Sequence, residues 1–364
     1  MLPPFSHVQR NVPLAGLTTL AVGGPALYFS SCTSVEEMRK TLRFAMDERM
    51  PLQVIGGGSN IIFPDEGFDG LVLRVDVRGT TFQDNGDHVS ITVAAGERWD
   101  DVVRLAIERG LSGIECLSGI PGNTGATPVQ NVGAYGQEVS ETIVSLRALE
   151  RRTLEIVEFT PAECGFGYRQ SRFKNVDADR YVILEVTFDL PKERRPVIRY
   201  PELKKFIDES AHPDSMQSTG DALLAVRNAV LALRKKKSMV IDPADPNTRS
   251  VGSFFLNPVI SPERFAALER SWRDAGQAAA IPSYPTPQGV KIPAAWLVEH
   301  AGFKRGLRRG GAGIYSNHAL ALINCGGTAT EILRLAEEIR SGVRERFGIS
   351  IELEPVVVRP PVPS

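Results

Sequence analysis

Apolar residues recur along the chain with two periods, which predict a mixture of helices and strands. Where they recur every three or four residues, as at Met38, Leu42 and Ala45, they predict a helix. Short or alternating β-branched runs predict strands. The predicted helices are 34–50, 100–109, 221–237, 262–273, 293–300 and 329–347. The predicted strands are 52–55, 61–63, 71–75, 90–95, 143–150, 154–159, 181–189, 314–315 and 319–324.

Residues with special backbone preferences mark the ends of several predicted helices. Ser34 is a good N-cap for the first helix, and Ser261 followed by Pro262 is a good start for the fourth. Gly110 and Gly348 follow two others, at the position where glycine commonly ends a helix.

Turn residues divide the chain into regions. A first region, in which helices and strands are mixed, ends near Pro191, and a polar, proline-containing connection at 192–220 follows it. Beyond the next helix, the sequence DPADPNTRS at 242–250 is dense in turn residues and marks a second boundary. The last residues, RPPVPS at 359–364, predict a loose polyproline-like tail.

The segment 116–136, CLSGIPGNTGATPVQNVGAYG, combines glycines and prolines without any charged residue. Glycine and proline disfavour a helix there, and the apolar residues disfavour disorder. Such a segment is suited to lie flat against a ligand, which its backbone N–H groups can then bind. A second glycine-rich loop, GGGSN, lies upstream at 56–60. Together the loops predict a large phosphate-containing cofactor, although each alone is also compatible with a surface turn.

The flanking sequence argues against the common nucleotide-binding motifs. A Rossmann fingerprint needs a strand, then G-x-G-x-x-G, then a helix. Here the loop at 56–60 is followed by a short apolar run at 61–63 and by Pro64, which predicts strand–loop–strand. The later loop has the spacing G-x-x-G-x-x-G, and no G-x-x-x-x-G-K-[ST] sequence occurs in the chain.

Four motifs resemble, in this order, those of the UDP-N-acetylenolpyruvoylglucosamine reductase family. They are VIGGGSNIIF at 54–63, GIPGNTGATPVQNVGAYG at 119–136, GYRQSRFK at 167–174 and GSFFLNP at 252–258. The resemblance extends from about Leu17 to Val358. The glycine-rich motifs are shared with a wider class of flavin-binding domains, whereas the last two are more specific to the reductase.

The resemblance implies an α+β protein with a two-part FAD-binding domain of the PCMH type and a C-terminal α/β substrate-binding domain. The implied regions are a FAD-binding domain of two subdomains at 17–191, a connection with the Tyr200 loop and a helix at 192–242, a substrate-binding domain at 243–348, a returning strand with a catalytic glutamate at 349–358, and the tail at 359–364.

The resemblance also implies FAD as a non-covalent cofactor and NADPH as the co-substrate. No histidine lies near either loop, since His88 is expected in a turn between strands, and Cys116 is expected to be a small buried thiol. The implied FAD-binding residues are Ile55, Gly56, Gly57, Gly58, Ser59, Asn60, Ile61, Ser118, Gly119, Ile120, Pro121, Gly122, Gly125, Ala126, Gln130, Gly133, Ala134, Tyr135 and Ile183.

The family's reaction passes a hydride from NADPH to FAD and then to the enolpyruvyl group of a UDP-sugar. Hydride arrival builds negative charge toward the neighbouring carboxylate, so catalysis needs a cation there and a proton donor at the adjacent carbon. By resemblance, Arg169 is the active-site arginine and Ser253 is the proton donor. Without the resemblance, Arg169 is also compatible with an exposed strand edge, and Ser253 with the start of a buried strand.

The family's catalytic glutamate corresponds to a position in IELEPVVV at 351–358. A count without gaps from Phe347 places it at Glu354, which we prefer, whereas matching the Leu-Glu-Pro triplet places Val356 there. Glu352 and Glu354 lie two residues apart and share one face of a regular strand, so the strand period does not distinguish them.

Further residues match substrate contacts of the family, namely Tyr168, Tyr200, Lys237, Asn257 and Tyr284. Tyr168 is expected at the contact between substrate and flavin, and Lys237 is expected to anchor the diphosphate. The other basic residues of the run at 234–237 are expected to be solvated. Tyr200 matches the tyrosine of a mobile loop that closes over the diphosphate, which assigns the chain to the loop-containing class. The tyrosines are also compatible with half-buried packing.

Composition limits the remaining classes of partner. A net charge of −1 gives no reason to expect nucleic acid or a membrane surface. The cysteines lack C-x-x-C spacing and the histidines lack H-x-x-x-H spacing, so no metal site or disulfide framework is predicted. The prolines and polar residues near the start predict no signal peptide, and no apolar stretch long enough to predict a membrane span occurs. We expect a cytoplasmic monomer whose partners are a UDP-sugar and NADPH.

Two other functions use the same kind of loops. A flavin-dependent oxidase on another small substrate would leave GYRQS, GSFFLNP and Lys237 unexplained. A silent nucleotide-sugar or flavin-binding protein would be expected to lack Arg169, Ser253 or Glu354, and all three are present. The NADPH-dependent reductase is therefore the preferred hypothesis.

Overall fold

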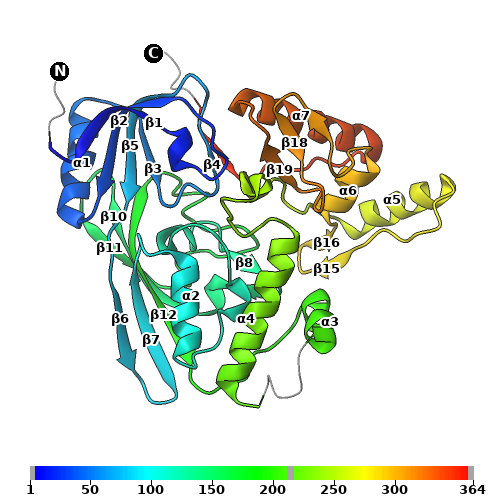
Figure 1. Ribbon diagram of the computed structural model, residues 1–364, viewed down its shortest axis with the longest axis horizontal. Helices are drawn as coiled ribbons and strands as arrows, with labels where there is room; N and C mark the ends of the chain where they lie inside the picture. Colours follow the sequence, from blue (N-terminus) through cyan, green and yellow to red (C-terminus); the bar gives the residue numbers. More distant parts are fainter. Residues whose placement is uncertain (1–4, 211–216, 360–364) are drawn as a thin grey trace.

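The structure, a computed structural model, describes residues 5–210 and 217–359 and confirms the α+β architecture (Figure 1). Of the tail predicted at 359–364, only Arg359 lies within the described residues. Two sheets and their covering helices form the N-terminal region, a pair of helices follows, and a smaller set of sheets and helices forms the C-terminal region.

The first sheet has the strand order β1 (Val8–Pro13), β2 (Pro25–Cys32), β5 (Phe68–Val75), β3 (Leu52–Ile55). Strands β2, β5 and β3 run parallel, and β1 is antiparallel to β2. Because β1 precedes residue 17, the predicted start of the domain leaves out one strand of its sheet.

Helix α1 (Val35–Asp47) covers this sheet with the apolar face that the sequence predicts. Met38 and Leu42 are buried in the same core as Leu71 of β5. Ser34 caps the helix as predicted, since its hydroxyl accepts the backbone N–H of Glu37.

The second sheet is antiparallel and has the strand order β11 (Ile156–Phe159), β10 (Ile143–Glu150), β12 (Tyr181–Pro191), β7 (His88–Ala94), β6 (Thr80–Asp84). Helix α2 (Trp99–Glu108) packs its fully buried Trp99 against Phe188, with ring centroids 5.5 Å apart. His88 was expected in a turn, and this expectation was wrong: His88 is the first residue of β7. Its ring nitrogen Nδ1 lies 2.8 Å from a carboxylate oxygen of Asp189 on the neighbouring strand β12, within hydrogen-bond distance.

The connection between the two regions is more helical than the sequence analysis predicted. Helix α4 (Thr219–Lys236) was expected, whereas α3 (Pro201–Ser210) replaces part of the predicted polar connection. Leu203 and Ile207 of α3 lie one turn apart and pack on Val226 and Val230 of α4. Burial against α4 therefore stabilises a helix that is too short to be stable alone.

The C-terminal region contains two small sheets. The first has the order β13 (Ser250–Ser253), β19 (Ala321–Asn324), β18 (Ala312–Ile314), β17 (Arg308–Arg309), and the second has the order β14 (Val259–Ile260), β16 (Gly289–Lys291), β15 (Tyr284–Thr286). The strands predicted near 314 and 319 are thus found, each with shifted ends. Both sheets are antiparallel.

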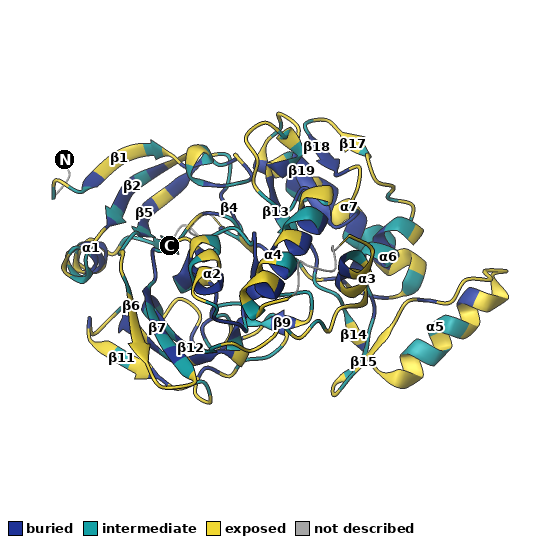
Figure 2. Ribbon diagram, turned by 60° about the horizontal axis from the view of Figure 1, so that its bottom comes forward, coloured by how far each residue is buried: buried dark blue, intermediate teal, exposed yellow. Residues whose placement is uncertain are grey.

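Three predicted helices complete this region, namely α5 (Pro262–Asp274), α6 (Ala294–His300) and α7 (Ala329–Phe347). Helix α5 begins at the predicted Ser261–Pro262 pair and projects from the rest of the molecule, largely exposed (Figure 2). Gly348 ends α7 in the left-handed conformation, as predicted. None of the helices in the described ranges is both long and apolar enough to span a membrane.

After α7 the chain returns to the N-terminal region. Leu353 forms a bridge with Phe255, and β20 (Val356–Val357) then pairs in parallel with β4 (Ile61–Ile62). Strands β3 and β4 flank the loop at 56–60, which confirms the predicted strand–loop–strand arrangement. The return places the segment around residue 354 beside the first glycine-rich loop.

Candidate functional site

Two adjoining cavities open where the glycine-rich loops face the C-terminal region. The first has a volume of about 120 Å³ and the second about 620 Å³. Ile120, Pro121, Ile241 and Thr248 line both, so the two form one continuous site.

The structure brings part of the predicted cofactor-binding set to these cavities. The residues on their walls are Gly56, Gly57, Ser59, Asn60, Gly119, Ile120, Pro121, Gly122, Gln130 and Gly133. The predicted residues outside both walls are Ile55, Gly58, Ile61, Ser118, Gly125, Ala126, Ala134, Tyr135 and Ile183. Ile183 lies in the core of the second sheet, and Tyr135 packs edge to face against Tyr200 in a cluster described below.

The two loops touch through backbone. A Cβ atom on Gly57 would lie 2.9 Å from the Cα of Gly122, too close for any side chain. Ser59 donates to the carbonyl of Pro121 at 3.2 Å, and Asn60 donates to the side-chain oxygen of Gln130 at 3.0 Å. The glycines therefore permit a close approach that these side chains then hold.

The loops differ in what their N–H groups do. The N–H groups of Gly119 and Gly125 donate to Asp100 and to the carbonyl of Ala95. In the described part of the chain, the N–H groups of residues 56–60 donate to no protein atom. The first loop therefore has main-chain donors available for a bound anion, whereas the second loop uses several of its donors internally.

Arg234 is a residue of the site that the sequence analysis placed in solvent. Only 8% of it is exposed, and it lines the first cavity. Among the described residues, its Nε is the one buried side-chain nitrogen or oxygen without a hydrogen-bond partner. Because the side chain lines the cavity, its guanidinium is placed to bind a carbonyl or anionic group of a bound cofactor. Lys235 and Lys236 are exposed, as expected.

Arg169 and Glu354 form an ion pair on the wall of the first cavity. Their Nε and Oε1 atoms are 3.3 Å apart, and both side chains are largely buried. The guanidinium also donates to the carbonyls of Asn131 and Gly133. Burial raises the pKa of Glu354, while Arg169 and Lys174 act in the opposite direction.

The two glutamates of the returning segment point to different surroundings. Glu354 lines the cavity, whereas Glu352 is exposed, and Val356 is 49% exposed. The backbone around Leu353 pairs with residues 254–256 and then changes partner, since the carbonyl of Asn60 accepts the N–H of Val356. The change of partner comes after Glu354, so Glu352 and Glu354 both flank Leu353, and they are distinguished by exposure rather than by the strand period.

Ser253 lies at the end of β13 and lines the same cavity as Arg169 and Glu354. The pairing of β13 with β19 shifts register between Ser250 and Ser253. The next two residues, Phe254 and Phe255, are buried and anchor the strand end. In the described ranges the Ser253 hydroxyl has no protein hydrogen-bond partner, so it is free to contact a ligand.

Tyr168 and Asn257 are joined directly. The amide nitrogen of Asn257 donates to the Tyr168 hydroxyl at 3.1 Å, and its amide oxygen accepts the N–H of Ala294 at 2.8 Å. The Lys291 ammonium lies 4.8 Å from the centre of the Tyr168 ring. Lys291, which no motif indicated, thus joins Tyr168 and Asn257 in a group that lies outside the walls of both cavities.

The other predicted substrate residues form a separate cluster beside α4. The Lys237 ammonium pairs with Glu202 at 2.8 Å and lies 6.0 Å from the centre of the Tyr135 ring. Tyr135 and Tyr200 meet edge to face at 5.5 Å. Burial raises the pKa of Tyr200, and the nearby Glu202 and Tyr284 add to the rise. The cluster therefore brings Tyr200, Lys237 and Tyr284 near one another, and the substrate contacts expected for them stay a prediction.

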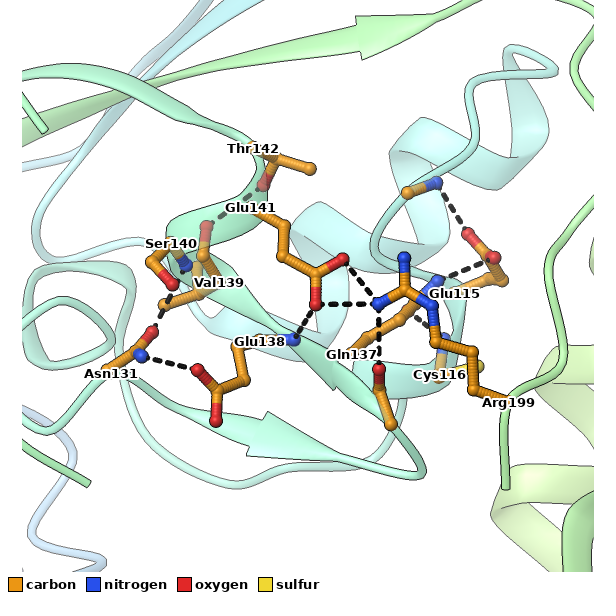
Figure 3. A network of polar contacts seen from close by, with 12 residues as sticks. Glu115, Cys116, Asn131, Gln137, Glu138, Val139, Ser140, Glu141, Thr142 and Arg199 are labelled. Atoms are coloured by element: carbon orange, nitrogen blue, oxygen red, sulfur yellow. Dashed lines mark hydrogen bonds and ion pairs between the residues drawn. The ribbon is translucent and has the colours of Figure 1, made fainter. Parts of the chain in front are cut away.

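A polar network joins this cluster to the second glycine-rich loop (Figure 3). Arg199, next to Tyr200, donates to both oxygens of Glu141 at 2.9 Å and to the carbonyl of Gly136 at 3.1 Å. The Gln137 side chain accepts the N–H of Cys116 and donates to Glu115. Cys116 itself is fully buried, and burial raises the pKa of its thiol, as expected for a structural residue.

Comparison with known proteins decides the family. A reductase from Thermobifida fusca, named UDP-N-acetylenolpyruvoylglucosamine reductase, is 46% identical over 96% of this chain and 97% of its own length. A protein of the same name from Streptomyces coelicolor is 45% identical over 98% of this chain and 91% of its own length. This chain belongs to the UDP-N-acetylenolpyruvoylglucosamine reductase family.

Domain and structure comparisons agree with this family. The family's C-terminal domain model matches residues 243–358, and a model described as an FAD binding domain matches residues 26–159. The crystal structure of the reductase from Thermus caldophilus covers 98% of this chain and 100% of its own, with a TM-score of 0.65 and 26% identity. The predicted fold class and FAD as the cofactor are thereby confirmed for this family member.

Proposed function

We propose that this protein is an NADPH-dependent flavoenzyme that reduces the enolpyruvyl group of UDP-N-acetylglucosamine enolpyruvate to UDP-N-acetylmuramate in the synthesis of peptidoglycan precursors. One observation carries the proposal: Arg169, Ser253 and Glu354 converge on a cavity that is also lined by the glycine-rich loops. The relatives' shared name indicates the same substrate.

Bound FAD would supply the hydride, which it receives from NADPH and passes to the terminal carbon of the enolpyruvyl group. The free N–H groups at 56–60 and the guanidinium of Arg234 are the donors that would hold it non-covalently. Main-chain donors suit this task because they bind phosphate and carbonyl oxygens without introducing a reactive side chain.

Arg169 would bind the substrate carboxylate. Its planar guanidinium suits a carboxylate that gains charge as the hydride arrives. Hydrogen bonds to the carbonyls of Asn131 and Gly133 fix its orientation before substrate binds. The group is therefore preorganised for the charge that develops in the transition state.

Ser253 would deliver the proton to the carbon next to the carboxylate. A serine is a weak acid, so the alkoxide that remains needs nearby positive charge, and Arg169 and Arg234 both line the cavity. Burial raises the pKa of Glu354, which favours a protonated form able to share in the proton transfer. Arg169, Ser253 and Glu354 are the proposed catalytic residues.

The UDP-sugar would extend from this cavity toward the cluster around Lys237. Lys237, Tyr200 and Tyr284 would bind the diphosphate side, while Tyr168 and Asn257 would contact the sugar beside the flavin. We further propose that the protein works as a cytoplasmic monomer.

Three spectra test the function. Purified protein should be yellow and release one FAD on denaturation, NADPH should bleach it anaerobically, and the enolpyruvyl sugar nucleotide should restore the colour. Air should restore it only slowly. Rapid reoxidation by air together with no response to the sugar nucleotide would instead indicate a flavin-dependent oxidase, and colourless protein that takes up no FAD would reject both.

A further inference from the structure

Lys174 lies directly behind the Arg169–Glu354 pair without lining the cavity. Its ammonium donates to the backbone carbonyl of Arg169 at 3.2 Å. The side chain is half-buried. It ends the GYRQSRFK motif, but its place in the sequence says nothing of this contact.

The contact falls on a residue whose backbone needs support. Arg169 has a φ of +54°, a left-handed conformation that is unfavourable for a residue with a long side chain. Asn131 supports the turn from the other side, since its amide donates to the carbonyl of Gly167 at 3.0 Å while its own carbonyl accepts from Arg169. Asn131 is fully engaged in the network of Figure 3. Lys174 and Asn131 therefore both hold the turn that positions the Arg169 guanidinium, and Lys174 is the charged one of the two.

Lys174 also carries the second positive charge that Glu354 faces. Arg169 and Lys174 both lower the pKa of the Glu354 carboxyl. Glu354 in turn acts on Tyr168, and Glu352, two residues before Glu354, acts on Lys174. Arg234 of α4 acts on Arg169 in turn. Burial lowers the pKa of Lys174, while Glu354 raises it, so the two charges support one another.

We propose that Lys174 is a positioning residue of this site, which holds the left-handed turn of Arg169 through its carbonyl and supplies the cationic charge behind Glu354. The inference rests on the proposed function, and it assigns to Lys174 no contact with substrate. Two consequences follow: removing the ammonium should loosen the guanidinium, and it should make Glu354 harder to ionise.

The test compares Lys174→Met, which keeps length and removes charge, with Lys174→Arg, which keeps charge and donors. In stopped-flow experiments, Lys174→Met should slow flavin reoxidation by substrate about 10- to 100-fold, as expected for a misplaced catalytic group. NADPH should still bleach the flavin at nearly the parent rate. The pKa that governs reoxidation should move to higher pH, and Lys174→Arg should recover most of the rate.

Lys192→Met is the matched control, since Lys192 is also half-buried and also paired with a carboxylate, that of Asp84, at 2.6 Å. Equal behaviour of Lys174→Met and Lys192→Met would overturn the proposal. Equal slowing of both half-reactions with loss of FAD would also overturn it, because that pattern indicates a purely structural role.

A second measurement does not depend on turnover. In protein labelled with ¹³C at glutamate carboxyls, the Glu354 signal can be assigned by its loss in Glu354→Gln. Its titration midpoint should lie at higher pH in Lys174→Met than in the parent. If the parent does not react with the sugar nucleotide, the proposed function fails, and this midpoint still decides the role of Lys174.

Discussion

Two parts of the joined cavities differ in the groups that they offer to a ligand. The part lined by the loop at 56–60, here called the backbone wall, offers backbone N–H groups and small residues. The part lined by Arg169, Ser253 and Glu354, here called the side-chain wall, offers charged and polar side chains. Backbone N–H groups can bind a cofactor without placing a reactive side chain beside it. A side-chain wall can carry charge and protons, which the substrate needs.

This contrast predicts that substitutions in the two walls affect different steps, FAD binding in one case and the reaction with substrate in the other. Changes in the backbone wall should reduce FAD binding and leave the chemistry of bound FAD unchanged. Changes in the side-chain wall should leave FAD bound and slow only the reaction with substrate.

The largest effect is expected from Ser253→Ala. Reoxidation of reduced flavin by substrate should slow about 10²–10⁴-fold, because the proposed proton donor is lost. Reduction by NADPH should remain near normal, since the hydroxyl acts only after the hydride has left the flavin. Stopped-flow absorbance measures both half-reactions, and equal slowing of the two would show that Ser253 is structural.

Glu354→Gln should come next, with reoxidation slowed about 10²-fold, because the amide keeps the shape and loses proton exchange. Glu352→Gln is the matched control, since Glu352 is exposed and should behave like the parent. The reverse pattern in the same assay would move the catalytic role to Glu352. Two parent-like variants would remove this segment from the mechanism.

The backbone wall is tested by Gly57→Ala. The added Cβ meets the Cα of Gly122 at 2.9 Å, and such overpacking costs about 1–3 kcal/mol. FAD affinity, measured by titration of the apoprotein, should fall, while reoxidation of the flavin that remains bound should be normal. Gly220→Ala, in the open first turn of α4, is the control and should retain full affinity. A Gly57→Ala protein with normal affinity would contradict the close approach.

The two walls also differ in how far the sequence predicted them. Glycine and proline exclude helices from 116–136, so the loops were predictable from composition alone. Arg234 was not, because a basic run at a helix end is normally solvated. The helical period could have predicted its burial, since Arg234 lies one turn after Val230, on the buried face of α4.

The returning segment was predictable only in part. The count from Phe347 selected Glu354, but no local pattern predicted that Glu354 lines a cavity beside the loop at 56–60 while Glu352 remains exposed. Helix α3 was missed for a related reason, since its stability comes from burial against α4 rather than from its own sequence. Local sequence therefore predicted the elements, and contacts between distant segments decided which side chains meet.

A third group of residues lies outside both walls and should affect binding alone. Lys237→Ala and Tyr200→Phe should raise the KM for the sugar nucleotide about tenfold, or ~1.4 kcal/mol, with little change in kcat. The diphosphate that they are proposed to bind does not change in the reaction. Lys235→Ala, from the same basic run but exposed, should leave KM unchanged. A fall in kcat at constant KM would contradict this assignment in steady-state assays.

The smallest effect is expected where the Tyr200 segment is tied to the second loop. Glu141→Gln removes the ion pair with Arg199, whose side chains are 38% and 55% exposed, and exposed pairs contribute only about 0.2–1 kcal/mol. The hydrogen bond from Arg199 to the carbonyl of Gly136 remains. The KM should therefore rise only about 1.4- to fivefold. The difference from the parent should shrink as salt screens the pair, so the assay is repeated at low and high ionic strength. Arg199→Ala, which loses both contacts, should raise KM more than Glu141→Gln. Equal KM values for the two variants and the parent would mean that Tyr200 reaches the site without this support.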